Sequence, residues 1–204
     1  MSRYDVFLKF FSLHNKERLD GLDKSYFADM TQQERDMAFS YLLKLVSVGG
    51  TEESIHGLFR ANSERAVEVV ERLLNERALG KEAEIAAAWN LGRRAQGDKY
   101  LSIFIRYMKD PDHRLRSLAA YYVPALNRDE LKSTLRGMIR VETELLPLIH
   151  AVNKLFECSG VDEDSVGEKK YLRLYRNLRG DDLPIKERAF KELEELAVDH
   201  DEGG

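Results

Sequence analysis

The sequence predicts an all-α protein, a right-handed α-solenoid in which helical hairpins stack side by side. Apolar residues recur at steps of three and four positions along most of the chain, as on one face of a helix. One such stripe returns after 32 positions, a spacing that suits a repeating unit of two helices. No segment shows the alternation typical of a strand, and only four prolines interrupt the chain. We therefore expect about twelve helices and no sheet.

The segment DPDHRLRSLAAYYVPAL, residues 110–126, shows the predicted helix most clearly. Asp110 can accept a hydrogen bond from a free amide at the helix start, and Pro111 suits the first helical position because its missing N–H is not needed there. Asp112 adds negative charge to the first turn, which is favourable against the helix dipole. The apolar stripe that follows consists of Leu115, Leu118, Ala119, Tyr122, Val123 and Leu126.

Other copies of this stripe indicate a repeat. Ala87 precedes Ala119 by 32 positions, Ile149 follows it by 30, and residues 185–196 carry a further echo. The segments 87–98 and 110–126 resemble the second helices of HEAT-type helical repeats, and the resemblance is good over residues 63–126. It implies one solenoid domain over residues 1–204 with faded terminal repeats, and we expect residues 199–204 to form a frayed tail.

The HEAT-like resemblance also implies a structural role for Arg116. In that family the arginine that follows the apolar anchor pairs with an aspartate of an adjoining turn. The expected partners here are Asp98, Asp110 and Asp112.

The remaining helices are expected from their end signals. In chain order they cover residues 3–14, 31–47, 51–60, 63–75, 81–94, 98–109, 112–125 and 127–140, followed by a helix near Pro147 and a last pair separated at residues 180–182. Capping boxes are expected at Thr31, Asn127 and Ser165, each of which has a glutamate three positions later. The polar stretch 158–167 is predicted to be the longest loop.

The composition favours a soluble cytoplasmic protein. The N-terminus lacks the pattern of a signal peptide, and no window of about 18 apolar residues would span a membrane. The single Cys158 excludes an internal disulfide and fits a reducing compartment. The five histidines never occur at the i, i+4 spacing of a helical metal site. We therefore expect no catalytic residues, no metal and no cofactor.

Charge is distributed unevenly along the chain. Residues 93–140 contain 11 Lys and Arg against 5 Asp and Glu, whereas residues 157–204 contain 14 acidic against 8 basic residues. The first interpretation is that these are solvated faces of amphipathic helices. The second is that an acidic surface meets a basic partner, because a net charge of −4 disfavours extensive phosphate binding. A local phosphate contact by Arg93, Arg94, Arg106, Arg114 and Arg116 stays open.

Trp89 and Tyr121 are the candidate partner-binding residues. They lie 32 positions apart, so they should occupy matching places on neighbouring second helices, which line the concave side of a solenoid. Large aromatic side chains are favoured anchors in interfaces, although a single tryptophan is more often part of the core. The exposed rim of this patch is expected to consist of Glu82, Arg93, Arg114, Ser117, Glu142 and Glu144.

These features favour a non-catalytic protein-binding scaffold. In size and charge the chain is similar to small bacterial immunity proteins, which neutralise a toxin nuclease, and the resemblance implies a basic protein partner whose active cleft is covered. One alternative is a HEAT-like DNA glycosylase or another nucleic-acid-binding repeat protein, which would use Trp89 and the basic centre. Another is a subunit related to phycobilin lyases, for which the sequence offers no chromophore or metal residues.

Overall fold

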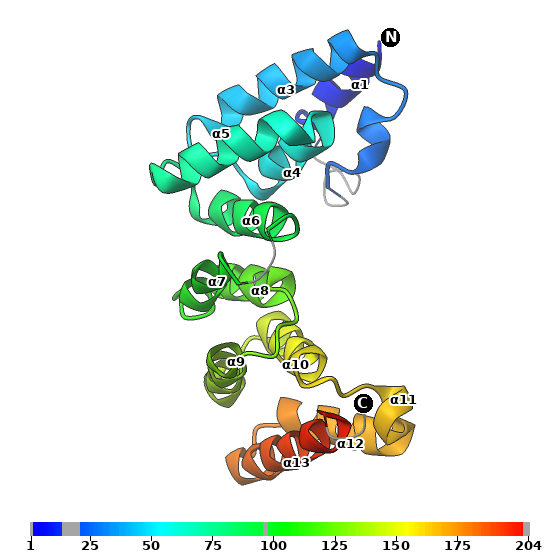
Figure 1. Ribbon diagram of the computed structural model, residues 1–204, viewed down its shortest axis with the longest axis vertical. Helices are drawn as coiled ribbons and strands as arrows, with labels where there is room; N and C mark the ends of the chain where they lie inside the picture. The colour runs from blue at the N-terminus through cyan, green and yellow to red at the C-terminus, as the bar shows by residue number, and fades with distance from the viewer. Residues whose placement is uncertain (1, 14–20, 96–97, 202–204) are drawn as a thin grey trace. The chain divides into compact units, whose positions relative to one another are not determined.

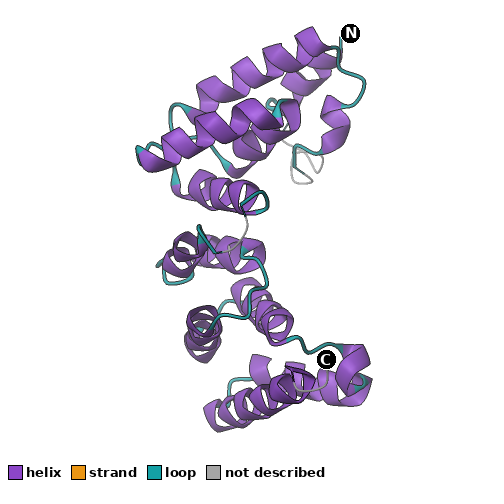
Figure 2. Cartoon of the chain, viewed as in Figure 1, coloured by secondary structure: helices purple, strands orange, loops and turns teal. Residues whose placement is uncertain are grey.

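The computed structural model describes residues 2–13, 21–95 and 98–201, and side chains of the last helix as far as residue 197. This part of the chain contains twelve α-helices, one 3-10 helix and no strand (Figures 1 and 2), so the all-helical class is confirmed. In chain order the elements are α1 (Arg3–Phe10), η1 (Lys24–Phe27), α3 (Gln32–Val46), α4 (Glu52–Ala61), α5 (Ser63–Asn75), α6 (Lys81–Gly92), α7 (Leu101–Tyr107), α8 (His113–Tyr122), α9 (Asp129–Val141), α10 (Leu145–Ser159), α11 (Glu163–Val166), α12 (Glu168–Arg179) and α13 (Leu183–Asp201).

The chain divides into two compact units, Met1–Tyr100 and Leu101–Gly204. In the first unit α4 is central and packs against α3, α5 and α6. The close approach of α3 and α4 depends on Gly57, because a Cβ there would lie 2.9 Å from the Cδ1 atom of Leu42. An aromatic cluster joins α1 to its neighbours, with the Phe7 ring centroid 5.5 Å from that of Phe27 and 5.8 Å from that of Tyr41.

The second unit is built around α10. Helix α10 packs against α8, α9 and α12, while α12 and α13 form a hairpin and α13 also contacts α9 (Figure 1). Its core contains Leu135, Ala151, Leu155 and Leu174, each fully buried. Some helices that are separated by one helix in the sequence also pack against each other, among them α4 with α6 and α8 with α10. The right-handed α-solenoid and the single domain over residues 1–204 stay predictions.

The helix starts confirm some of the predicted caps. Thr31 caps α3 and forms a capping box with Glu34, and Thr51 caps α4. Helix α5, expected over residues 63–75, starts at Ser63 and is capped by Asn62, whose side chain accepts from the Arg65 amide. Helix α8 ends at Tyr122, before Pro124, because a residue that precedes proline is disfavoured in the helical region.

Other predicted boundaries are wrong. Helix α9 starts without a side-chain cap, so the box expected at Asn127 does not form. Asp162 caps the short helix α11 by accepting from the Ser165 amide, so part of the predicted loop is helical. Helix α12 then follows Gly167, whose φ is 81°. Pro147 lies in the first turn of α10, where its missing N–H costs nothing. Of the expected tail, residues 199–201 continue α13 and residues 202–204 lie outside the described part.

Candidate functional site

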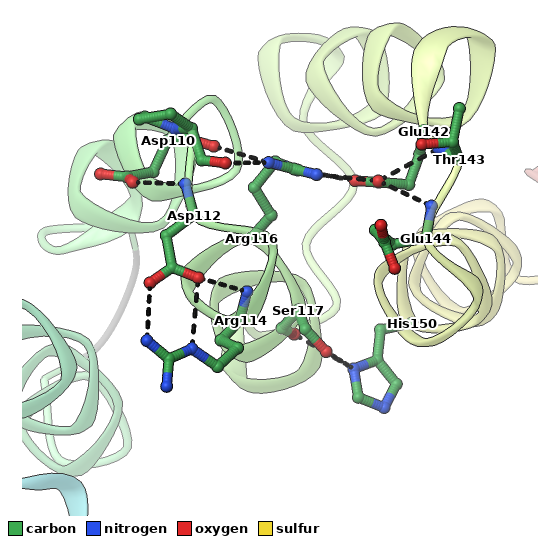
Figure 3. Close-up of polar contacts among 10 residues, drawn as sticks. Asp110, Asp112, Arg114, Arg116, Ser117, Glu142, Thr143, Glu144 and His150 are labelled. Atoms are coloured by element: carbon green, nitrogen blue, oxygen red, sulfur yellow. Dashed lines mark hydrogen bonds and ion pairs between the residues drawn. The ribbon is translucent and has the colours of Figure 1, made fainter.

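The turn between α7 and α8 orients the start of α8. Asp112, rather than Asp110, is the N-cap: its carboxylate accepts from the Arg114 amide at 2.9 Å, and the helix starts at His113. Asp110 acts one step earlier, because its carboxylate accepts from the Asp112 amide at 2.9 Å and closes the turn around Pro111 (Figure 3). We expected Asp110 to cap the helix and Pro111 to be its first residue. This prediction is wrong by two positions, because Asp112 is the cap and His113 is the first residue.

Arg116 forms a bidentate ion pair with Glu142, the C-cap of α9, which lies three positions before the first residue of α10. Its Nε and Nη2 atoms donate to the two carboxylate oxygens at 2.7 and 2.8 Å, and its Nη1 atom donates to the carbonyl oxygens of Asp110 and Pro111, each at 2.9 Å (Figure 3). The expected carboxylate partners Asp98, Asp110 and Asp112 are thus replaced by Glu142. Glu142 lies 26 positions after Arg116 in the sequence, so no local pattern indicated that the two residues would pair.

Glu142 is buried, which corrects its expected place on an exposed rim. Its side chain is 2% exposed and also accepts from the amides of Thr143 and Glu144, at 3.2 and 3.1 Å. Burial alone would raise the pKa of Glu142, but the hydrogen bonds from Arg116 and these amides outweigh it and lower the pKa. Glu142 therefore joins the α7–α8 turn to the start of α10.

Ser117 and His150 connect α8 to α10. Ser117 is 6% exposed, so the expectation that it lies on the rim is also wrong. The His150 Nδ1 atom is 3.1 Å from the Ser117 carbonyl oxygen and 3.0 Å from its hydroxyl oxygen (Figure 3). Because a carbonyl oxygen only accepts, the contact with it favours the neutral tautomer that carries the proton on Nδ1, in which Nε2 is an acceptor.

Tyr121 lies beside His150 on the same surface. The two ring centroids are 5.1 Å apart, and the Tyr121 residue is 59% exposed. Leu146 precedes His150 by four positions and so shares its helix face, and Leu145 adjoins it; these leucines are 56% and 63% exposed. We call Tyr121, Leu145, Leu146 and His150 the α8–α10 face. It is an aromatic and aliphatic surface next to the exposed residues Arg114 and Glu144.

The leucines and His150 were missed in the sequence. The repeat shift of 30 positions matched Leu145 to Leu115, so Leu145 was expected on the inward stripe, and Leu146 was not singled out. Adjacent residues of one helix can both be buried, as Leu155 and Phe156 are further along α10, so nothing in the sequence signalled that both leucines are exposed. His150 carried no such signal, because its contact with Tyr121 depends on the packing of two helices.

In the first unit, Trp89 is half-buried on α6 rather than fully in the core. Its indole meets the His56 ring edge-on at 5.2 Å, and the Arg93 guanidinium lies 4.7 Å from its ring centroid. The Asn90 amide donates to the Ala86 carbonyl at 2.8 Å and is 2.9 Å from His56 Nδ1, which therefore accepts. Glu82 is exposed on the same helix. The predicted patch residues thus fall into two sets: Glu82, Trp89 and Arg93 on one unit, and the others on the second.

Several cations of the basic centre are paired with acidic residues from the segments on either side of it. In the first unit Lys99 Nζ is 3.0 Å from a Glu71 carboxylate oxygen. In the second, Arg140 pairs with Glu187 at 2.5 Å and Arg136 pairs with Glu194, so the basic side of α9 lies against the acidic side of α13. Neither sequence interpretation of the charge pattern anticipated this internal pairing.

The arginines proposed for a phosphate contact also have neighbours of their own. Arg94 hydrogen-bonds to the Ser63 hydroxyl, the Arg106 guanidinium lies 4.8 Å from the Tyr107 ring centroid, and Arg114 pairs with Asp112 at 3.1 Å. Arg93 stacks on Trp89 and Arg116 holds Glu142, as described above. These contacts engage the guanidinium groups that a phosphate would need.

Cys158 is buried, and desolvation raises the pKa of its thiol, which disfavours the reactive thiolate. Within the described residues no three His, Cys, Asp or Glu side chains are grouped so that they could hold a metal ion. The described part of the chain also has no helix with the length and apolar character needed to cross a bilayer. What this arrangement offers chemically is surface contact: exposed apolar rings and side chains, an imidazole acceptor and a carboxylate.

No protein-family model, curated protein or solved structure shows significant similarity to this chain.

Proposed function

We propose that this chain is a non-catalytic protein-binding scaffold, a HEAT-like α-solenoid that uses its α8–α10 face to dock on a basic partner. The observation that carries the proposal is the exposure of Tyr121, Leu145 and Leu146 on two adjoining helices. Exposed apolar side chains that cluster on a folded surface are typical of interaction sites. Tyrosine is also among the residues that contribute most to interfaces.

The polar groups at this face favour a cationic partner. His150 offers the Nε2 acceptor, Glu144 offers an exposed carboxylate and the Tyr121 ring offers a π-surface, all of which suit lysine or arginine side chains. Arg114, the nearby cation, is already paired with Asp112. Opposite charges across an interface mainly accelerate association and suppress wrong partners.

The most concrete form of the proposal is an immunity protein that occludes the cleft of a basic toxin nuclease. A buried Arg116–Glu142 pair and the Ser117–His150 contact make the α8–α10 face rigid, so it would bind without a large ordering cost. The protein itself would contribute no chemistry. This form rests on the similarity in size and charge to immunity proteins, together with the face described here.

The test uses the nuclease domain that the immunity-protein proposal expects to be encoded next to this gene, and the absence of such a domain would contradict this form of the proposal. We expect the full chain to inhibit its DNA cleavage at a one-to-one ratio. Tyr121→Ala and Leu146→Ala should each weaken binding about tenfold or more, as at interface hot spots, while Leu183→Ala, an exposed leucine at the start of α13, should change it less than about twofold. Equal effects at all three positions, or no inhibition, would contradict the proposal.

Charge reversal tests the acidic contribution separately. Glu144→Lys should slow association at low salt and have little effect at high salt, because exposed charges are screened. Glu142 is unsuitable for this test, since its replacement would disturb the fold. Duplex DNA binding that persists at about 200 mM salt would favour the nucleic-acid alternative instead.

A further inference from the structure

Helix α12 carries a basic face that differs in charge from the α8–α10 face of the same unit. Its twelve residues include five cations and one acid, Glu168. A groove runs along this helix, and its lining includes the cations Lys169, Lys170, Arg173 and Arg176 together with Leu172 and the acidic Glu168. The net charge of the whole chain is −4, so this face is a local reversal of the prevailing charge.

The cations of α12 are paired less completely than those of α9. Arg136 and Arg140 of α9 each have a glutamate from α13. On α12, Lys170 and Arg173 share one carboxylate, that of Glu192 from α13, which is 3.9 Å from Lys170 Nζ. Within the described part of the chain no carboxylate lies within ion-pair distance of Lys169 or Arg176, both of which are exposed. The α12 face therefore has more positively charged side chains than carboxylates that pair with them.

The exposed groups form a short pattern with an apolar centre. Lys169, Arg173 and Arg176 follow one another at four- and three-residue steps, so they share one side of the helix and span about 10 Å along its axis. Leu172 lies between them and is 36% exposed. A partner that matches this pattern carries carboxylates about 10 Å apart on either side of an apolar side chain.

The borders of this face argue against a nucleic acid. Acidic residues precede α12, with Glu163 and Asp164 in α11, and others follow it at Asp181 and Asp182. The helix is about 18 Å long, and a nucleic acid strand, which carries a phosphate about every 3.4 Å along the helix axis, would extend over these acidic borders. A short acidic protein segment would not, and it would also use the Leu172 contact.

We propose that the basic face of α12 is a second docking surface, which binds a short amphipathic acidic segment of a protein. This goes beyond the proposed function, because it makes the chain a two-sided adaptor with faces for partners of opposite charge. The contact consists of ion pairs from Lys169 and Arg176 and of apolar contact at Leu172. It needs no chemical step.

The probe is a labelled alanine-rich peptide of about 16 residues, with two glutamates about two turns apart and a leucine midway. Fluorescence anisotropy at low salt should show binding to the full chain with a Kd on the order of 100 μM or tighter. The same peptide with glutamines in place of the glutamates should bind at least about tenfold more weakly. A single-stranded DNA oligonucleotide of similar length is the competing probe.

The decisive variant is Lys169→Glu with Arg176→Glu, which should weaken peptide binding about tenfold or more. Its matched control is Arg188→Glu with Lys191→Glu, which makes the same change in net charge on exposed positions of α13 and should leave the affinity within about twofold. Leu172→Ala should weaken peptide binding about threefold, as expected for lost apolar contact. If the glutamate variant unfolds by circular dichroism, the corresponding glutamine variant replaces it.

No peptide binding at about 1 mM, or equal losses in the variant and its control, would overturn the proposal. Tighter binding of the oligonucleotide than of the peptide would also overturn it, in favour of a nucleic-acid surface. Nuclease inhibition should be unchanged in the α12 variant, so this proposal and the one for the α8–α10 face can fail independently.

Discussion

Replacing Glu142 by alanine is expected to destabilise residues 101–204 more than any surface charge substitution. The change removes both carboxylate oxygens from Arg116 and leaves the amides of Thr143 and Glu144 without their acceptor. The Arg116 side chain, 20% exposed, would keep its charge in a site with few other acceptors. Because the Glu142 side chain is 2% exposed, solvent cannot readily replace what is lost.

The expected cost is about 3 kcal/mol, the lower end for removing one partner of a buried pair, since Arg116 is partly solvated. This is a large share of the roughly 5–15 kcal/mol that stabilises a typical domain. Replacing both residues, as in Arg116→Met with Glu142→Leu, should cost less than Glu142→Ala alone, because no uncompensated charge then stays behind. The Lys191–Glu195 pair of α13, whose side chains are 79% and 66% exposed, is the control and should couple by less than about 1 kcal/mol.

Urea unfolding followed by circular dichroism gives the free energies, and a double-mutant cycle gives the coupling between Arg116 and Glu142. The pKa of Glu142 is lowered from its ordinary 4.5, so the ionised pair stabilises the fold fully above that value and is lost as pH falls through the lowered one. The stability gap between the wild type and Glu142→Gln should therefore close below about pH 4.5. A cost below about 1 kcal/mol for Glu142→Ala, or additive single substitutions, would refute this reasoning.

Lys186 is 4% exposed and its Nζ atom donates to the Ile139 carbonyl at 2.6 Å, at the end of α9, while burial lowers its pKa. The folded state thus releases this proton more readily than the unfolded state. The free energy of unfolding of the wild type should therefore rise as pH increases from the lowered pKa to 10.5. Thermal melts of Lys186→Met over the same pH range should lack that rise. Gly137→Ala should stabilise the protein by about 0.5–1 kcal/mol, because a Cβ there meets nothing within 4 Å. Gly57→Ala should not stabilise it, because its Cβ would lie 2.9 Å from Leu42; equal melting shifts for the two glycine variants would contradict this.

The helical class and several helix starts followed from the sequence because their causes are local. Thr31 caps α3 through an amide three positions away, and Pro124 stops α8 through its own ring. The α7–α8 turn shows where local patterns fail. Asp110 was correctly expected to accept from an amide, but Asp112, which was expected only to add negative charge to the first turn, is the residue that caps the helix, because Asp110 closes the turn around Pro111.

The candidate site followed from the sequence only in part. Tyr121 was identified from its place in the repeat and is exposed, and Trp89 is half-buried against His56. Ser117 and Glu142 were expected on the surface, yet both are buried. Ser117 contacts His150 of α10, and Glu142 forms an ion pair with Arg116. Polarity alone does not decide exposure when a partner from another helix can satisfy the group.

By itself the sequence determined that this chain is helical, because apolar periodicity and caps act over one or two turns. It also determined the overall excess of negative charge. Only the tertiary structure decided which charges remain at the surface: Arg136, Arg140 and Arg116 meet glutamates far along the chain, whereas Lys169 and Arg176 do not. The physical reason is that ion pairs and exposed faces depend on distances between helices, which packing sets and which spacing along one helix does not contain.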